Sequence, residues 1–171
     1  MGKIVCNLAT SVDGFIADEN GGVDWLNDFQ AEDYGMIDFF EQCGTAIMGS
    51  KTYEQALSFN SWFGKMEGMV FTSRKLPQFN NEIINFVSGN PGPVVEQLHK
   101  KEKDSWLVGG GQLITSFIDL HLLDELIITI VPRLLGKGLA LCPSIKEVNK
   151  LQLVDSKAYT DGILQLRYRV V

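Results

Sequence analysis

Hydrophobic positions along the chain form two patterns: short, nearly continuous apolar runs, and stretches in which apolar residues recur every three or four positions. The first pattern predicts strands, the first of them buried, and the second predicts amphipathic helices. The runs place strands at residues 4–9, 45–48, 68–72, 82–87, 105–108, 125–131, 151–158 and 162–170. The spacing places helices at residues 32–42, 50–57, 93–103 and 112–120. This alternation is typical of an α/β domain.

Turn-forming residues separate these elements. Residues 10–24 are rich in Gly, Asp and Asn and are expected to form a loop, and Asp161-Gly162 predicts a hairpin turn between the last two strands. The near-continuous run at 125–131 is expected at the centre of the sheet. Because no linker, repeat or low-complexity segment interrupts the pattern, we expect one domain over residues 1–171.

Composition excludes several classes of function. The chain has 171 residues, and its 15 basic and 21 acidic side chains give a net charge of −6. A nucleic-acid partner is not expected, since no basic stripe is visible. No apolar run approaches the ~20 residues of a membrane span, and the start lacks a signal-peptide pattern, which predicts a cytoplasmic protein. Three separated cysteines and two isolated histidines form no zinc motif, so no metal is expected.

Three segments that follow predicted strands contain glycine or other small residues: 48–52, 72–75 and 108–112. We expect each to open a helix, whose free backbone N–H groups and positive dipole end favour an anion. In open α/β sheets such junctions meet at the carboxyl edge, where ligands bind. Any one glycine is equally compatible with a tight turn. Three junctions in one domain favour a phosphate-bearing ligand.

The common nucleotide-binding motifs do not account for these junctions. A GxGxxG motif beginning at Gly109 would need Gly or Ala where Ile114 stands. A Walker loop that contains Gly136 and Lys137 would need Ser or Thr where Gly138 stands. The ligand is therefore expected to bind on a different fold.

Two charged side chains near strand ends have two interpretations each. Arg74, between Ser73 and Lys75, suits a monophosphate, and it is equally compatible with a solvated loop. Asp13, before Gly14, is a candidate general acid, whereas aspartate beside glycine more often caps a turn.

Taken together and in order, six segments resemble the dihydrofolate reductase superfamily, with a closer likeness to its riboflavin-biosynthesis reductase branch. They are residues 11–17, 48–54, 72–74, 109–113, 123–126 and 132–138. The likeness spans nearly the whole chain. It implies a three-layer α/β/α sandwich with a mostly parallel mixed central sheet and a C-terminal antiparallel hairpin. It also implies hydride transfer from NADPH and a homodimer.

The resemblance implies cofactor contacts in several segments. The residues are Ala9, Ile16, Gly49, Ser50, Lys51, Thr52, Thr72, Ser73, Arg74, Val108, Gly109, Gly110, Gly111, Gln112 and Leu113. Ala9 and Ile16 would border the nicotinamide, and residues 49–52 would hold the pyrophosphate at a helix start. Arg74 with its serine neighbour would bind the 2′-phosphate and favour NADPH over NADH. The glycine run would pass beneath the nicotinamide and pyrophosphate.

Substrate contacts are implied for Trp25, Thr129 and Arg133. Arg133 would meet an anionic substrate, or it makes a structural ion pair. Thr129 matches a position that touches the substrate ring in folate enzymes; plain packing in a strand of branched residues is the alternative.

The folate enzymes place a carboxylic acid on the first helix, and this sequence departs from that pattern. The matching position is about Gln30, which leaves Asp28, Glu32 and Asp33 as nearby candidate proton donors. The alternative for each is an exposed acidic helix start that complements the helix dipole.

The arginine that binds the folate tail is also missing, because residues 58–65 contain none. Folate is therefore disfavoured. Phe59, Trp62 and Phe63 in this segment form a stacking wall, or they belong to the core or a dimer contact.

Three functions remain. The first is an NADPH-dependent reductase of a small heterocyclic or carbonyl/imine substrate. The second is 5-amino-6-(5-phosphoribosylamino)uracil reductase of riboflavin biosynthesis, an enzyme often fused to a deaminase whose zinc motif is absent here. The third is an NADPH-binding protein without catalysis, for which the missing helix acid is the main support.

Overall fold

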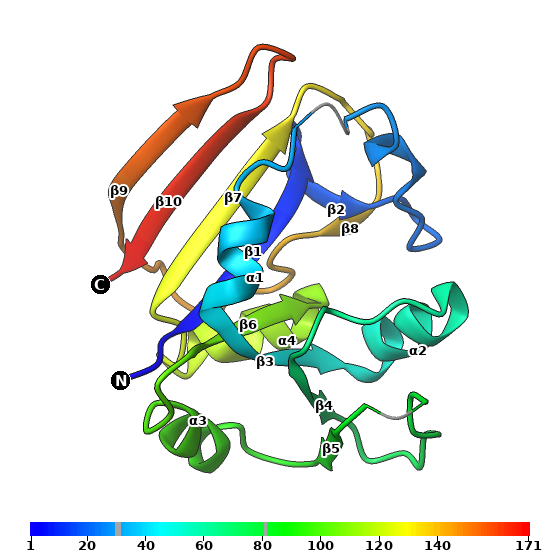
Figure 1. Ribbon diagram of the computed structural model, residues 1–171. Coiled ribbons are helices and arrows are strands. Elements are labelled where there is room, and N and C mark those ends of the chain that lie inside the picture. The colour runs from blue at the N-terminus through cyan, green and yellow to red at the C-terminus, as the bar shows by residue number, and fades with distance from the viewer. Residues whose placement is uncertain (30–31, 81) are drawn as a thin grey trace.

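An eight-stranded sheet forms the centre of the computed structural model, which describes residues 1–29, 32–80 and 82–171 (Figure 1). Its strand order is β5-β4-β3-β6-β1-β7-β10-β9. Neighbours from β5 to β7 are parallel, and β10 runs antiparallel to both β7 and β9. The strands are β1 (Ile4–Ser11), β3 (Cys43–Gly49), β4 (Glu67–Phe71), β5 (Ile84–Val87), β6 (Asp104–Gly109), β7 (Glu125–Val131), β9 (Leu151–Ala158) and β10 (Leu164–Val170). This is the mostly parallel mixed sheet with a C-terminal hairpin that the sequence predicted.

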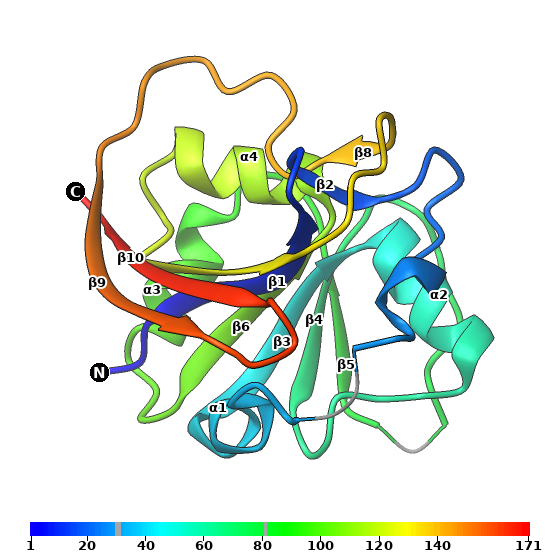
Figure 2. The same cartoon turned by 90° about the horizontal axis from the view of Figure 1, so that it is seen from above.

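Helices cover both faces of the sheet (Figure 2). On one face lie α1 (Met36–Gln42) and α2 (Ser50–Phe59), and on the other α3 (Gly92–Leu98) and α4 (Gly111–Asp119). Successive residues of a strand point to opposite faces, so Val5 packs with Tyr53 of α2, whereas Cys6 packs with Phe117 of α4. The three-layer α/β/α prediction is confirmed.

The predicted loop at residues 10–24 contains regular structure that the sequence pattern did not indicate. Strand β2 (Phe15–Ala17) pairs with β8 (Leu139–Ala140) in a second, two-stranded sheet, and a 3-10 turn, η1, spans Asp24–Leu26. A Cβ at Gly138 would lie 2.2 Å from the carbonyl oxygen of Ala17, so only glycine permits this approach.

Two helices are shorter than predicted. The first begins at Met36 rather than 32, because Tyr34 and Gly35 have φ values of 52° and 77°, outside the helical region. The helix predicted to reach 103 ends at Leu98. Strand β7 has the predicted bounds and lies inside the sheet between β1 and β10, although the two middle strands are β6 and β1.

The expectation that residues 72–75 open a helix is wrong. Strand β4 leads into bends at Ser73 and Arg74, and the described part of the connection to β5 contains no helix. A parallel pair needs a crossover but not a helical one. Only two of the three small-residue junctions therefore present a helix start.

The predicted hairpin turn is present, with Gly162 at φ 90° between β9 and β10. All eight residues of β9 are exposed, because it is the outer strand of the sheet. In the described part of the chain, none of the helices is long and apolar enough to cross a membrane.

Candidate functional site

Two helices begin side by side at the carboxyl edge of β3 and β6, which are neighbouring parallel strands. Gly49 precedes α2 and Gly110 precedes α4, both with extended backbone and without a side-chain cap among the described residues. Since the first N–H groups of a helix have no intrahelical partner, both starts offer free donors and the positive end of a dipole. The edge therefore has the free donors and the dipole that favour an anion.

Close contacts join these two helix starts into one surface. A Cβ at Gly49 would lie 3.9 Å from the carbonyl oxygen of Gly109, and one at Gly110 would lie 3.7 Å from the Oγ1 atom of Thr52. The peptide between Gly109 and Gly110 is cis. Glycine at 49 and 110 therefore leaves the surface between the two helix starts open. Larger residues at these two positions would fill it with their side chains. A pyrophosphate fits this combination of free donors and space.

The remaining residues of the glycine run have different surroundings. A Cβ at Gly111 would lie 2.6 Å from the carbonyl oxygen of Ala140, so glycine here is needed by packing. Val108 and Leu113 pack against the two cores on opposite sheet faces, while Gln112 is exposed. Gly110 is thus the open position of the run, whereas Gly109 is buried with a φ of 122°.

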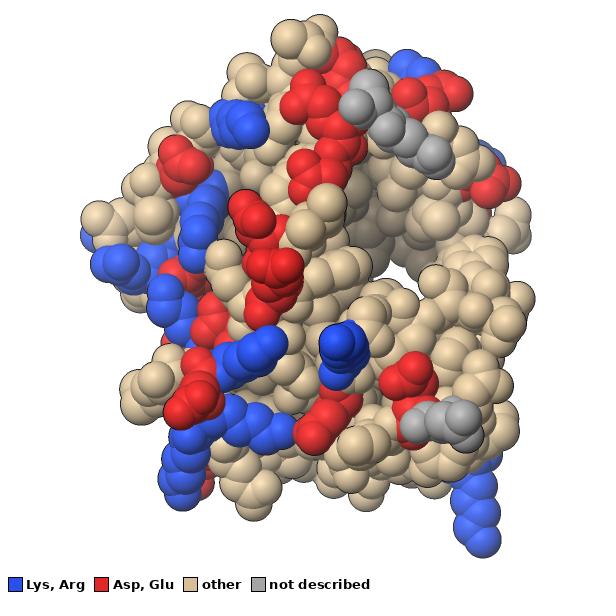
Figure 3. Space-filling view, in the orientation of Figure 1, with Lys and Arg blue, Asp and Glu red and all other residues tan. Residues whose placement is uncertain are grey.

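The predicted nicotinamide contacts come from β1 and β2. Ala9, near the carboxyl end of β1, packs against a small buried cluster of Val131, Tyr159 and Ile163. Ile16 is half-buried in β2. In the space-filling view the surface is hollowed between the segment that carries β2 and helix α2 (Figure 3). This hollow opens onto the carboxyl edge.

Arg74 reaches helix α2 by a bidentate ion pair. Its Nη1 and Nη2 atoms lie 3.0 and 2.8 Å from the Oε1 and Oε2 atoms of Glu54, and its backbone N–H donates to the Oγ1 atom of Thr72. The hydrogen bonds from Arg74 lower the pKa of Glu54. Both side chains are about half exposed, with Ser73 beside them. The bend thus brings the Arg74 guanidinium next to the part of α2 that follows Lys51 and Thr52.

Asp13, one of the candidate proton donors, already has partners. Asp13 accepts hydrogen bonds from the backbone N–H groups of Leu135 (3.1 Å) and Gly136 (2.7 Å). A hydrogen bond from the Ser11 hydroxyl, together with these two, lowers the pKa of Asp13. Asp13 therefore joins two distant segments as a carboxylate rather than capping only its own turn.

The candidate acids before α1, at positions 28, 32 and 33, differ in their surroundings. Asp33 accepts from the N–H of Ile37 at 3.2 Å, and Asp28 is paired with Arg133. Glu32 is exposed, and the matching position Gln30 lies outside the described residues.

The three substrate candidates gather near the carboxyl end of β7. Arg133 donates to Asp28 at 2.8 Å and lies 4.9 Å from the Phe29 ring, as the ion-pair interpretation expects. The Oγ1 atom of Thr129 accepts from the side chain of Gln165 at 3.0 Å. The Nε1 atom of Trp25 is buried without a hydrogen-bond partner among the described residues.

A polar cavity of about 330 Å³ lies between α1 and the sheet. Aligned rows of the sheet form its floor: Asn7, Ile127, Arg167 and Asp155 lie in one row. The next row holds Gln165 and Lys157, and the α1 side adds Tyr34 and Asp38. The phenol of Tyr34 donates to the Asp161 carboxylate, which raises the pKa of Tyr34 to about 12.

Sequence reasoning overlooked this cavity. One signal was available: Asn7 is a polar residue inside a run predicted to be fully buried, and a buried amide needs a partner. The other lining residues carried no signal, because their approach to Asn7 depends on the pairing of β7, β10 and β9.

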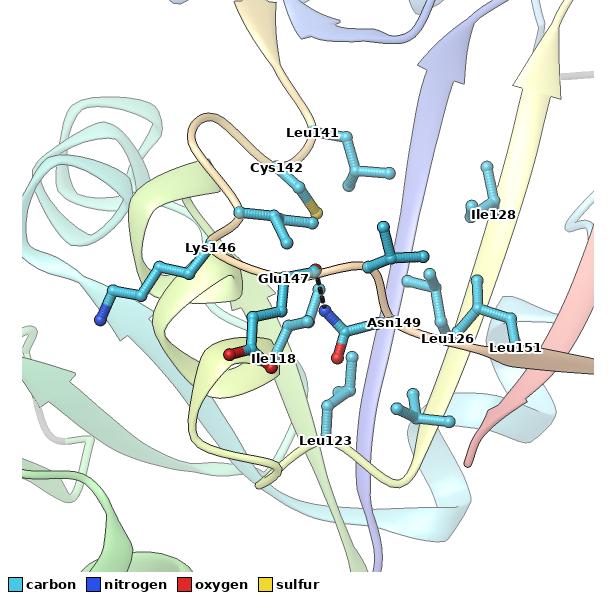
Figure 4. Close-up of a pocket in the computed structure, with 13 residues that line it drawn as sticks. Ile118, Leu123, Leu126, Ile128, Leu141, Cys142, Lys146, Glu147, Asn149 and Leu151 are labelled. Carbon is cyan, nitrogen blue, oxygen red and sulfur yellow. Dashed lines mark hydrogen bonds between the residues drawn. The ribbon is translucent and has the colours of Figure 1, made fainter.

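A larger cavity of about 560 Å³ lies on the opposite face, beneath residues 141–151 (Figure 4). Its walls are mostly apolar, with Ile118 of α4 and Leu126 of β7 among them, and Lys146 points away from it. Its polar lining residues are Lys146, Glu147 and Asn149, and it lies on the far side of the sheet from the polar cavity. Its size alone gives it no chemical role.

The aromatic segment after α2 is mostly core. Trp62 packs against Tyr53 and Phe79, with ring centroids 6.2 and 5.3 Å away, and Phe63 packs against Trp106. Phe59 is 63% exposed. A substrate-stacking wall is therefore not needed to explain Trp62 and Phe63.

Comparison with known proteins places the chain in the RibD C-terminal domain family, whose pattern it matches over residues 2–165. The chain belongs to this family. It is 33% identical to the uncharacterized protein YwjB of Bacillus subtilis (strain 168), over 97% of each chain.

Solved structures are similar in fold. A putative riboflavin biosynthesis protein from Shewanella sp. PV-4 has a TM-score of 0.88 at 29% identity, with 100% of this chain and 99% of that one covered. A dihydrofolate reductase from Enterococcus faecalis, complexed with NADP(H), has a TM-score of 0.66 at 18% identity, covering 99% and 96%. The family resemblance stated from the sequence is confirmed, and the chain has the fold of a reductase family.

Proposed function

We propose that the chain is an NADPH-dependent reductase that transfers a hydride to a small heterocyclic or carbonyl/imine substrate. The observation that carries this proposal is the pair of uncapped helix starts at Gly49 and Gly110, joined at one open edge. Free N–H groups from two helices suit a pyrophosphate, which bears charge on both of its phosphates. The dinucleotide would extend from this edge in both directions.

NADPH, when bound, supplies the hydride. The chain's own residues bind and orient: the N–H groups at the starts of α2 and α4 hold the pyrophosphate, and Ala9 and Ile16 border the nicotinamide. Ala9, Thr129 and Gln165 share one row of the sheet, so a substrate against the nicotinamide would also contact this row. Fixed positions of this kind raise reaction rates by removing the cost of orientation.

Arg74 supports the preference for NADPH over NADH. The 2′-phosphate of NADPH would take the place of Glu54 at the guanidinium, because an exposed ion pair is easily exchanged. Ser73 and Thr72 lie in the same bend and supply hydroxyl groups.

The second candidate function is 5-amino-6-(5-phosphoribosylamino)uracil reductase, which the family match favours. The third is an NADPH-binding protein without catalysis. It is favoured by the sequence at the position that matches the helix acid of folate enzymes, which is about Gln30 and not an acid. Turnover separates the first two candidates from the third.

A homodimer in the cytoplasm completes the proposal. The outer strand β9 is exposed over all its residues, and its Leu153 and Val154 are 53% and 50% exposed. An exposed apolar edge strand readily pairs with another chain. Light scattering would test this part separately.

Thermal unfolding with each cofactor tests the central claim. A ligand that binds the native state raises its stability by RT ln(1 + [L]/Kd), so about 2.7 kcal/mol is expected at a hundredfold excess over Kd. NADPH should raise the melting temperature more than NADH. No shift with either cofactor would exclude the proposal, and oxidation of NADPH with a supplied substrate would confirm catalysis.

A further inference from the structure

The polar cavity under α1 holds a buried amide that lacks a good partner. Asn7 is only 6% exposed, and it lines the cavity. Within the described residues, its side chain makes one hydrogen bond, from Nδ2 to the sulfur of Met36 at 3.6 Å. Thioether sulfur is a weak acceptor, and an unsatisfied buried amide is costly. The amide is therefore available to a ligand in the cavity.

A second amide faces the cavity from the next row of the sheet. The Nε2 atom of Gln165 donates to the Oγ1 atom of Thr129 at 3.0 Å and to the carbonyl oxygen of Tyr34 at 3.2 Å. Both of its N–H groups are thus occupied, which fixes the amide and leaves its oxygen as an acceptor. Together, Asn7 and Gln165 present one donor and two acceptors.

The cavity is close enough to the cofactor edge to hold a reacting compound. Asn7 and Ala9 are two residues apart on β1, so their side chains share a face at a spacing of about 7 Å. A single six-membered ring with its substituents spans this distance. A ring beside Ala9 would therefore reach the Asn7 amide.

Charges around the cavity disfavour an anion. Asp38, Asp104 and Asp155 line it, and acidic side chains form a band over α1 in Figure 3. Of the two cations, Arg167 already binds Glu125 at 2.5 Å. The other, Lys157, lies 4.4 Å from the ring of Tyr159. A phosphate in this cavity would meet more negative than positive charge.

From these observations we infer that the cavity under α1 binds an uncharged, unphosphorylated ring whose edge carries a hydrogen-bond donor beside an acceptor, and that Asn7 recognises this edge. The inference deepens the proposed function by naming a substrate class. Binding of the ring is argued from the cavity itself, and only its reduction by hydride transfer rests on the proposed function. Asn7 is a specificity residue, because a site that pairs with a polar edge rejects analogues that lack it.

Uracil and two analogues test this assignment. Uracil has the required edge, 1,3-dimethyluracil lacks its N–H donors, and uridine 5′-monophosphate adds a phosphate. Titrations of the isotope-labelled protein, with and without NADPH, would be followed by NMR. Uracil is expected to shift the backbone signals of Asn7, Gly35 and Gln165, and each analogue should bind about tenfold more weakly.

Variants assign the effect to Asn7. Asn7→Ala should weaken uracil binding about tenfold and leave the NADPH dissociation constant unchanged. Asn149→Ala, in the loop beneath the opposite face, is the matched control and should bind uracil like the wild type. Asn7→Leu replaces the alanine variant if the latter does not fold.

Undiminished uracil binding by either Asn7 variant, or tighter binding of the monophosphate, would overturn the inference. So would uracil shifts confined to residues outside the cavity. Uracil binding that depends on Asn7 in a protein that fails to bind NADPH would keep this inference and remove the reductase proposal.

Discussion

The edge proposed to bind the cofactor and the cavity under α1 belong to the same sheet, but they are made of different groups. The edge consists of backbone N–H groups at the starts of α2 and α4, with glycine keeping side chains away. The cavity consists of side chains from β1, β7, β10, β9 and α1. A backbone site depends on a short local segment, whereas a side-chain site depends on how distant strands pair. Adding atoms should damage the first, and removing polar atoms should damage the second.

The largest effect is expected from adding a side chain at the edge. Gly49→Val should lower NADPH affinity about a hundredfold, because the side chain blocks N–H groups that form charge-assisted hydrogen bonds. The fold should tolerate it, since Gly49 has φ −82° and a Cβ there would approach only the Gly109 oxygen within 4 Å. Isothermal titration calorimetry measures the affinity. The NADPH affinity of Gly49→Ala should lie between those of the wild type and Gly49→Val. Unchanged affinity in the valine variant would remove pyrophosphate from this edge.

Removing a charge beneath the cavity should have the next largest effect. Glu125 has a side chain only 7% exposed and is paired with Lys3 at 2.6 Å and Arg167 at 2.5 Å. Glu125→Gln should lower the free energy of unfolding by about 2 kcal/mol, because two cations lose their partner. Urea unfolding at pH 7 measures the loss. A Glu67→Gln variant, at an exposed pair with Lys101, is the control and should lose far less.

The wild type and Glu125→Gln also allow a test of the pH dependence of stability. Burial alone would raise the pKa of Glu125, but hydrogen bonds from Lys3 and Arg167 bring it below its ordinary value of 4.5. A lowered pKa in the folded state stabilises the protein above the unfolded pKa, and this contribution disappears as the pH falls through the folded value. The stability difference between wild type and Glu125→Gln should thus be full at pH 7 and shrink below pH 4.5. A constant difference would exclude the charge as its cause.

Arg74→Ala tests whether this side chain binds the 2′-phosphate of NADPH. It should weaken NADPH binding about tenfold and NADH binding little, since only NADPH carries the 2′-phosphate that a guanidinium binds with two hydrogen bonds. Lys75→Ala, one residue along the same exposed loop, is the matched control. Equal losses for the two cofactors in Arg74→Ala would contradict the 2′-phosphate role.

The smallest effect is expected at the partner of Arg74. Glu54→Gln should tighten NADPH about twofold, because it removes an exposed negative charge that competes with the phosphate for the guanidinium. NADH affinity should not change. Weaker NADPH binding in this variant would mean that Glu54 positions Arg74 instead of competing for it.

Local sequence was sufficient for the two helix starts at the carboxyl edge and for most elements of the sheet. The junctions at 48–52 and 108–112 combine strand, glycine and helix within five residues, so their conformation follows from turn and helix-start chemistry. Asp161-Gly162 is local in the same way. The segment 72–75 looked alike but opens no helix, because the chain beyond it, not the bend itself, decides whether a helix follows.

Tertiary structure decided the partners of the charged and amide side chains. Arg133 meets Asp28 across 105 positions, and Asp13 meets Gly136 across 123. Asn7 and Gln165 come together only because β7 pairs with β1 on one side and β10 on the other. The sequence alone determined the buried strands, the two glycine junctions and the family. The cavity under α1 required the strand pairing, since hydrophobic periodicity fixes which face a residue points to but not which strand lies beside it.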